Sequence, residues 1–125
     1  MSDIKMNIWD REFVLDVTYD CYSDEEISQK QKDAIEKFPS AENEITKALV
    51  KVKEYCLNQN KKEIGEDNIS NIFKYVVPKY LFVPRDDKNR LVAIMCKYKY
   101  DAESGLAIVF RNEKLAQIGK QDIVL

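Results

Sequence analysis

The last 35 residues of the chain constrain its fold most strongly, because apolar and polar residues alternate there with a period of two. Residues 91–100, 106–111 and 114–118 each show the alternation that is typical of a strand with one buried face. The polar segments between them, 101–105 and 112–113, hold residue types that favour tight turns. We therefore predict three consecutive antiparallel strands, with the rest of the chain packed against their sheet.

The N-terminal residues show the same alternation. Residues 3–10 predict a short edge strand, and residues 12–20 predict a half-buried strand whose Phe13 face points to the core. A helix is expected to begin at Ser23, because Glu26 follows at the spacing of a capping box. The acidic residues around Ser23 are then explained by the helix start and need no catalytic role.

Two more helices and a strand are expected before the C-terminal sheet. Apolar spacing predicts a helix over residues 41–58 with Ser40 as its cap, followed by a polar loop. Asp67 is expected to cap a third, short helix that Pro78 stops. Residues 79–83 predict a further strand.

These elements predict an α+β fold with the order β-α-α-α-β-β-β-β in one domain, residues 1–125. We expect an antiparallel sheet of about four to five strands, with three helices packed mainly on one face. The second face of the sheet carries Ala93, Met95, Ala107 and Val109, so it is too apolar to be fully exposed. A helix of the same chain or another protein chain must cover it, and we expect the helix.

The composition excludes several classes of function. The chain has no histidine, which removes Ser-His-Asp and Cys-His catalytic systems and every histidine-ligated metal site. It also has no phosphate-binding glycine loop and no Cys-x-x-Cys pair, so we expect no cofactor and lean against an enzyme. No membrane-spanning run or signal peptide is seen, and the three cysteines are widely spaced, which favours the reducing cytoplasm.

Charge is unevenly distributed along the chain. The net charge is only −2, which gives no attraction to nucleic acid or to an anionic membrane. The first 26 residues, however, carry eight acidic and two basic side chains. Solvated surface is the simpler interpretation of this excess, and an acidic surface that binds a basic partner is the sharper one.

One polar cluster follows from the predicted topology. If strands 106–111 and 114–118 form a hairpin, the segment before the first lies beside the segment after the second. This brings together, at one end of the sheet, Asp101, Glu103, Ser104, Gln121 and Asp122. The cluster is a candidate binding surface or a divalent-cation site, or else simple turn chemistry in which the short polar side chains satisfy loop N–H groups.

The segments 100–110 and 119–125 also resemble an uncharacterised family of small bacterial cytosolic proteins. The shared features are an Asp-x-Glu-x-Gly-Leu-x-Ile turn and strand and a terminal Gly-x-Gln-Asp-Ile motif, and weaker similarity covers most of the chain. The chain departs from the pattern at Ser104, where histidine is common, and at Ala102, where an acid is common. This resemblance implies a domain of unknown function, and similar small α+β proteins are suspected of acting as immunity proteins.

Three hypotheses of function remain open. The first is a non-enzymatic protein-binding domain, in particular a toxin-neutralising immunity protein whose partner is basic. The second is a divalent-metal-binding protein or metal-dependent enzyme that uses Asp101, Glu103 and Asp122. The third is a homo-oligomeric structural protein. Both a monomer and a homodimer are compatible with the sequence.

Overall fold

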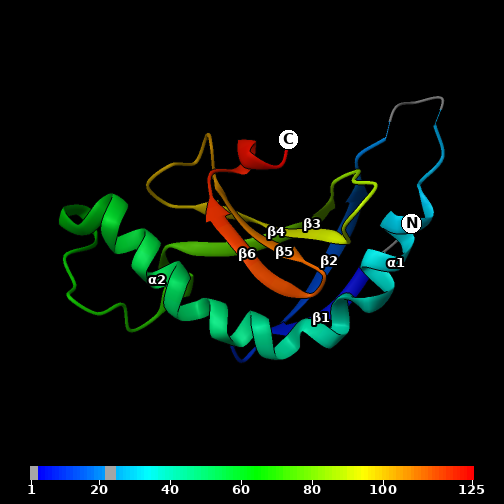
Figure 1. Ribbon diagram of the computed structural model, residues 1–125. Coiled ribbons are helices and arrows are strands. Elements are labelled where there is room, and N and C mark those ends of the chain that lie inside the picture. Colours follow the sequence, from blue (N-terminus) through cyan, green and yellow to red (C-terminus); the bar gives the residue numbers. More distant parts are fainter. Residues whose placement is uncertain (1–2, 22–24) are drawn as a thin grey trace.

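The computed structural model describes residues 3–21 and 25–125. Six strands, two α-helices and three 3-10 turns follow one another along the described residues (Figure 1). In chain order these are β1 (Asp3–Ile8), β2 (Arg11–Tyr19), α1 (Gln29–Lys37), η1 (Phe38–Ala41), α2 (Glu42–Ile64), η2 (Ile72–Lys74), β3 (Val76–Val83), β4 (Leu91–Tyr98), β5 (Leu106–Arg111), β6 (Lys114–Gly119) and η3 (Gln121–Ile123).

The six strands form one sheet in the order β1-β2-β3-β4-β5-β6. Four neighbouring pairs are antiparallel, but β2 and β3 run parallel, with Asp16 opposite Tyr80 and Tyr19 opposite Val83. The predicted antiparallel sheet of four to five strands was therefore wrong. The cause is the connection between β2 and β3, because both helices lie in it and a parallel pair needs such a long crossover.

The first helix begins later than predicted. Ser23, the expected cap, lies outside the described residues, and Glu26 precedes the helix rather than belonging to it. Ser28 is the cap: its Oγ accepts a hydrogen bond from the Gln31 N–H, and the Gln31 Oε1 accepts one from the Ser28 N–H. This reciprocal pair is a complete capping box, built with glutamine in place of glutamate.

The prediction of three helices was also wrong. Residues 58–64, expected to be a loop, continue α2 with a kink at Asn60, and the helix ends at Gly65 in the left-handed conformation with φ +69°. Ile64 anchors the last turn in the core, and the Lys and Glu residues before it are good helix formers. No helix in the described part of the chain is long and apolar enough to cross a membrane.

The expected third helix is only the single turn η2, which Asn71 caps through a hydrogen bond from the Phe73 N–H. Asp67 does not begin a helix, and Ser40, the expected cap of α2, donates its hydroxyl hydrogen to the Lys37 carbonyl. Pro78 lies within β3, at a point where the register with β4 shifts between Pro78 and Tyr80. Such a bulge tolerates proline because the ladder is already interrupted there.

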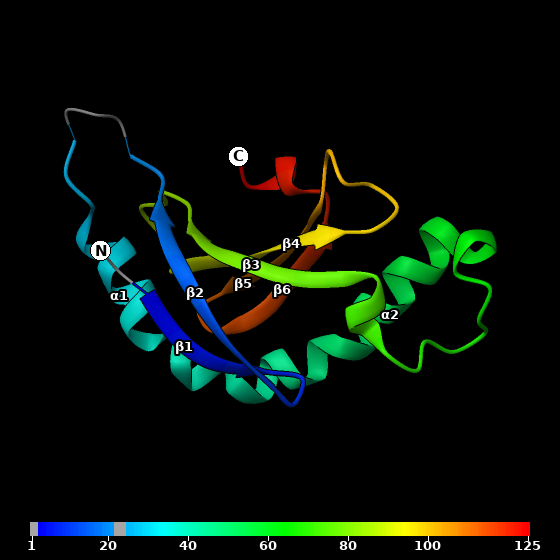
Figure 2. The ribbon, with the colours of Figure 1, turned by 180° about the vertical axis from the view of Figure 1, so that it is seen from behind.

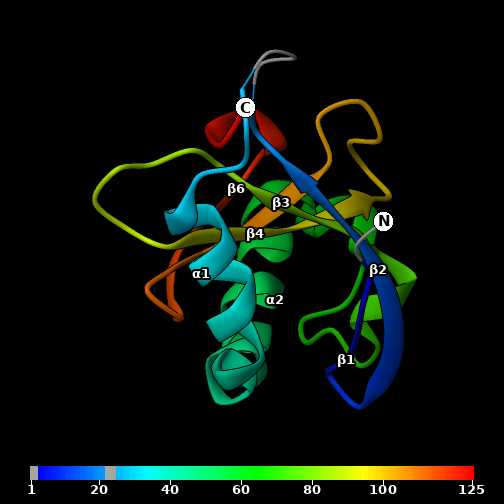
Figure 3. The ribbon, with the colours of Figure 1, turned by 90° about the vertical axis from the view of Figure 1, so that its right-hand side faces the viewer.

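The helices lie inside the curve of the sheet (Figures 2 and 3). Figure 3 shows α1 and α2 between the two edge strands, with β6 on one side and β1 on the other. The main core forms between the helices and the concave face of the sheet, and includes Phe38, Ile45, Val52, Ile94 and Phe110. The curvature matters for function because it brings both edges of the sheet close to helical residues.

The convex face of the sheet has its own small core. Phe82, Ala93, Met95, Ala107 and Val109 are buried there, and Val124 packs against them. The C-terminal segment lies over this face, on the side of the sheet opposite the helices (Figure 1). The cover of this face is therefore intramolecular, as expected, but it comes from the C-terminal segment and not from one of the predicted helices.

The β1–β2 hairpin is held to the helices at its tip. Trp9 and Asp10 form a two-residue loop with φ of +52° and +67°, and the Trp9 indole donates a hydrogen bond to the Ile45 carbonyl at 2.9 Å. The Phe73 ring lies 5.9 Å from the Trp9 ring, and the Arg11 guanidinium lies 4.2 Å from the centre of the Phe73 ring. This anchoring fixes the position of the edge strand β1 relative to the helices.

Candidate functional site

The two segments of the predicted polar cluster do meet at one end of the sheet. The Gln121 N–H donates a hydrogen bond to the Ser104 carbonyl at 3.0 Å, and the Gln121 Nε2 donates to the Cys96 carbonyl at 3.1 Å. The Asp101 carboxylate accepts from the Ser104 N–H at 3.1 Å, and the Lys120 Nζ lies 3.9 Å from its second oxygen. These contacts tie the turn to the C-terminal segment.

Two members of the cluster stay outside this network. Glu103 and Asp122 are exposed, and neither has a hydrogen bond or an ion pair among the described residues. Burial, and then the negative charge of Asp101 among other nearby groups, raises the pKa of the Tyr55 phenol. The inner residues of the cluster therefore stabilise the turn through hydrogen bonds, and only the exposed acids Glu103 and Asp122 offer a surface to a ligand.

The described residues contain no group of three or more cysteine or acidic side chains that could hold a metal ion. Metal binding by Asp101, Glu103 and Asp122 stays a prediction of the sequence, and this geometry does not favour it. Calorimetric titration with magnesium, calcium and manganese tests it directly.

The buried thiols do not offer a nucleophile either. Cys56 and Cys96 are free and fully buried, whereas Cys21 is free and exposed. Burial raises the pKa of the Cys56 thiol to about 11, and it also raises the pKa of Cys96. The thiolate is the reactive form, so both buried thiols are expected to be inert at neutral pH.

The difference in exposure between Cys21 and the two buried thiols predicts a difference in reactivity. A disulfide reagent such as DTNB at about pH 8 should modify one thiol, Cys21, in the folded protein and all three in urea, because only Cys21 is accessible to the reagent before unfolding. The measurement is the absorbance of the released thiolate with time. A Cys21→Ser variant should leave no rapid phase in the folded protein. Rapid release from that variant would show that a buried thiol is accessible.

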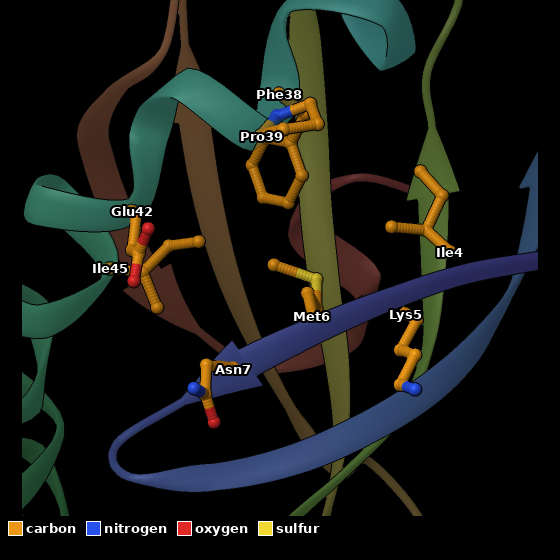
Figure 4. A pocket seen from close by; sticks show the side chains of 8 residues that line it. All are labelled: Ile4, Lys5, Met6, Asn7, Phe38, Pro39, Glu42 and Ile45. Atoms are coloured by element: carbon orange, nitrogen blue, oxygen red, sulfur yellow. The ribbon is translucent and has the colours of Figure 1, made fainter.

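A groove lies between β1 and the junction of the two helices. It has a volume of about 280 Å³ and is lined by Ile4, Lys5, Met6, Asn7, Phe38, Pro39, Glu42 and Ile45. Figure 4 shows the side chains of Phe38, Ile45 and Met6 converging from the helix side and the strand side of this space. The floor is therefore apolar, while the polar side chains stand at its margin.

The outward face of the hairpin beside this groove is acidic. Described residues 3–20 hold five acidic and two basic side chains. Asp3 and Asp16 lie directly opposite each other, and their mutual hydrogen bond, followed by desolvation and the charge of Asp16, raises the pKa of Asp3. On the same face Val14 is 65% exposed. Like charges opposite each other destabilise a strand pair, so a cation from a partner would relieve this arrangement.

The two edges of the sheet differ. At the β6 edge, the Glu44 carboxylate accepts a hydrogen bond from the Leu115 N–H at 3.1 Å, and the register with β5 shifts between Val109 and Phe110. A second, shallower hollow of about 360 Å³ lies there between α2 and β6. By contrast, β1 pairs with β2 in an unbroken register from Asp3 to Ile8, and no strand of the described residues lies on its other side. The β1 edge is thus the regular and open one.

The sequence indicated the acidic segment and the edge strand, but it did not reveal the groove. Ile4 and Met6 alternate as expected of a strand. Phe38 and Ile45 come from helices whose placement beside β1 depends on the crossover and on the Trp9 anchor. No local pattern contains that information.

The fold and the candidate surface define a sheet-rich α+β protein with an open acidic edge. Comparison with known families assigns this protein to a class whose function is not established. The chain belongs to a family described as a domain of unknown function (DUF6985), which matches residues 2–125. No curated protein matches the chain, and no solved structure matches it.

Proposed function

We propose that this protein is a non-enzymatic protein-binding domain, and that it binds a basic protein through β1 and the outward face of the β1–β2 hairpin. The observation that carries the proposal is the open β1 edge beside an apolar groove of about 280 Å³. An apolar groove with charged residues at its margin has the anatomy of a protein interface: apolar contacts supply affinity and the rim sets specificity.

The acidic side chains of the hairpin indicate the charge of the partner. Five acids against two bases over residues 3–20 create a negative surface that steers a positively charged protein toward it. The exposed Val14 lies on the same face as Asp16 and provides apolar contact between the charges. Within this class we propose a toxin-neutralising role in the bacterial cytoplasm, supported by this charge and by the resemblance to small immunity-like proteins.

The experiment is a binding measurement with the basic proteins encoded beside the gene. Each is purified in an inactive form and titrated calorimetrically with this protein. A variant with Asp3→Asn and Asp16→Asn removes two opposed charges and should weaken binding about tenfold or more, since complementary charges at an interface contribute strongly to affinity. The midpoint of thermal unfolding should not fall, because like-charge repulsion is removed.

The matched control neutralises two acids at the other candidate surface. A variant with Glu103→Gln and Asp122→Asn carries the same change of charge at exposed residues and should bind within about twofold of the unchanged protein. If this control loses binding while the hairpin variant keeps it, the partner binds at the polar cluster and the proposed surface is wrong. If no protein encoded beside the gene binds, the toxin-neutralising role is abandoned.

A further inference from the structure

The hairpin geometry determines which backbone groups of β1 are free. Trp9 and Asp10 form a two-residue loop, so the flanking residues Ile8 and Arg11 are a hydrogen-bonded pair. Hydrogen-bonded pairs alternate along an antiparallel ladder. The N–H and C=O groups of Ile8, Met6 and Ile4 therefore face β2. Those of Asp3, Lys5 and Asn7 face the open edge, where no strand from residues 3–21 or 25–125 lies beside β1.

The side chains on the two faces of β1 differ in the same alternating manner. Ile4 and Met6 are half-buried and face the groove, whereas Lys5 and Asn7 are exposed. Figure 4 shows Met6 directed toward Phe38 across the groove. A strand added beside β1 would place every second side chain in this apolar space and the others on the outward face, beside Asp3, Lys5 and Asn7.

We propose that β1 accepts an extended segment of the partner as an additional antiparallel strand, with apolar residues alternating toward the groove and a lysine or arginine opposite Asp3. This inference rests on the proposed function, because it specifies how the same surface binds. The main-chain groups of Lys5 and Asn7 supply hydrogen bonds, and the groove and the paired aspartates supply specificity.

The occupant is a basic segment rather than a second copy of this chain. A second copy would bring another hairpin with five acids and two bases against the first, which is repulsive. Pairing of β1 with its copy about the middle of the strand would also set Lys5 opposite Lys5. A segment with alternating apolar and cationic residues has neither conflict.

The probe is the capped peptide Arg-Val-Thr-Val-Arg, which reads the same in both directions. When its threonine lies opposite Lys5, both valines face the groove and one arginine lies opposite Asp3. Binding is followed by NMR titration of the ¹⁵N-labelled protein, together with amide exchange. The amides of Lys5 and Asn7 should become protected about tenfold or more, because each gains a main-chain acceptor.

Two matched pairs test the mode of binding. Methylation of the threonine nitrogen should abolish binding, because in an antiparallel pair that N–H donates to Lys5, whereas methylation of a valine nitrogen, which points away, should be tolerated. In the protein, the Lys5→Pro variant should bind the peptide about tenfold more weakly than the Lys5→Thr variant, because both lose the same charge and only threonine keeps the N–H. Both variants leave the β1–β2 hydrogen bonds intact, and thermal unfolding verifies this.

The charge requirement is tested separately. The peptide Glu-Val-Thr-Val-Glu should bind about fivefold more weakly or not at all, and the variant with Asp3→Asn and Asp16→Asn should reduce the difference between the two peptides. Equal affinity of the two peptides would contradict the assignment of a cation opposite Asp3.

The outcomes separate this inference from the proposed function. No binding of the peptide at millimolar concentration, or binding without protection of Lys5 and Asn7, overturns strand addition. The proposed function survives that result if a basic protein still binds and still depends on Asp3 and Asp16. Protection of Lys5 and Asn7 that appears on concentrating the protein alone would identify a second copy as the occupant, which also overturns the inference.

Discussion

Replacing Gln31 by methionine should lower the free energy of unfolding by about 2–4 kcal/mol, because it removes three hydrogen bonds that this buried side chain makes. Gln31 is only 1% exposed and is the buried polar residue of the described core. Its Nε2 donates hydrogen bonds to the Asp20 carbonyl at 2.9 Å and to the Val83 carbonyl at 3.1 Å, and its Oε1 caps Ser28. One side chain thus joins the ends of β2 and β3 to the start of α1.

The measurement is urea unfolding followed by circular dichroism. Gln29→Met is the control, since Gln29 lies in the same helix but is exposed, and it should change stability by less than about 0.5 kcal/mol. Equal effects of the two substitutions would show that the buried hydrogen bonds of Gln31 contribute little beyond helix propensity.

A Gln31→Glu variant adds a dependence on pH whose sign is fixed by burial. A carboxylate at this site would face two carbonyl oxygens, so the folded-state pKa of the glutamate should be raised above the unfolded value of about 4.3. The folded state then binds more protons, and the stability of this variant should fall as pH rises above that value. A variant whose stability rises with pH through this range would contradict the geometry around Gln31.

Substitution of Gly105 by alanine should cost about 2–4 kcal/mol, because strain and a steric clash add together. Gly105 has φ of +59°, and a Cβ atom there would lie 2.6 Å from the Gln121 Nε2 and 2.8 Å from the Cys96 carbonyl oxygen. The carbonyl belongs to the backbone of β4 and cannot move aside. The glycine is therefore required where the turn at 101–105 meets the C-terminal segment.

Gly65 provides the matched control. It also has a positive φ, of +69°, but nothing lies within 4 Å of the position that a Cβ would occupy. Gly65→Ala should therefore cost only the conformational strain, about 1 kcal/mol. The difference between the two variants in urea unfolding isolates the clash at Gly105. If Gly65→Ala were as damaging as Gly105→Ala, close packing between the turn and Gln121 would not be the cause.

Strands with strong alternation were predicted well from the sequence. The structure confirms strands where the patterns at 12–20, 91–100, 106–111 and 114–118 indicated them, although the second of these ends at Tyr98, and it confirms the short edge strand near the N-terminus. Alternation reports a local physical fact, namely that one face of a strand is buried. The meeting of Asp101–Gly105 with Gln121 also followed, because a hairpin dictates which segments lie side by side.

The helices and the sheet order depended on non-local contacts and were predicted poorly. Ser23 and Glu26 matched the spacing of a capping box, yet Ser28 and Gln31 form it, because Gln31 also bonds to β2 and β3. Ile69 and Ile72 have helical spacing, although Ile69 lies in irregular chain and Ile72 begins only the single turn η2; both pack against the core. Tertiary contacts override local propensity in both cases.

The candidate groove could not be predicted for the same reason. Its two walls come from β1 and from the junction of the helices, and only the crossover between β2 and β3 brings them together. The acidic excess near the N-terminus was visible in the sequence, but the sequence does not show that Asp3 and Asp16 lie opposite each other beside an open edge.

The most direct test of the proposed binding surface is amide hydrogen exchange of this protein with and without a bound basic partner. The account predicts that the amides of Lys5 and Asn7 exchange slowly only in the complex, while those of the 101–105 turn are unchanged. Protection of the 101–105 turn and of the segment around Asp122, with β1 unchanged, would contradict it and place the binding surface at the opposite site.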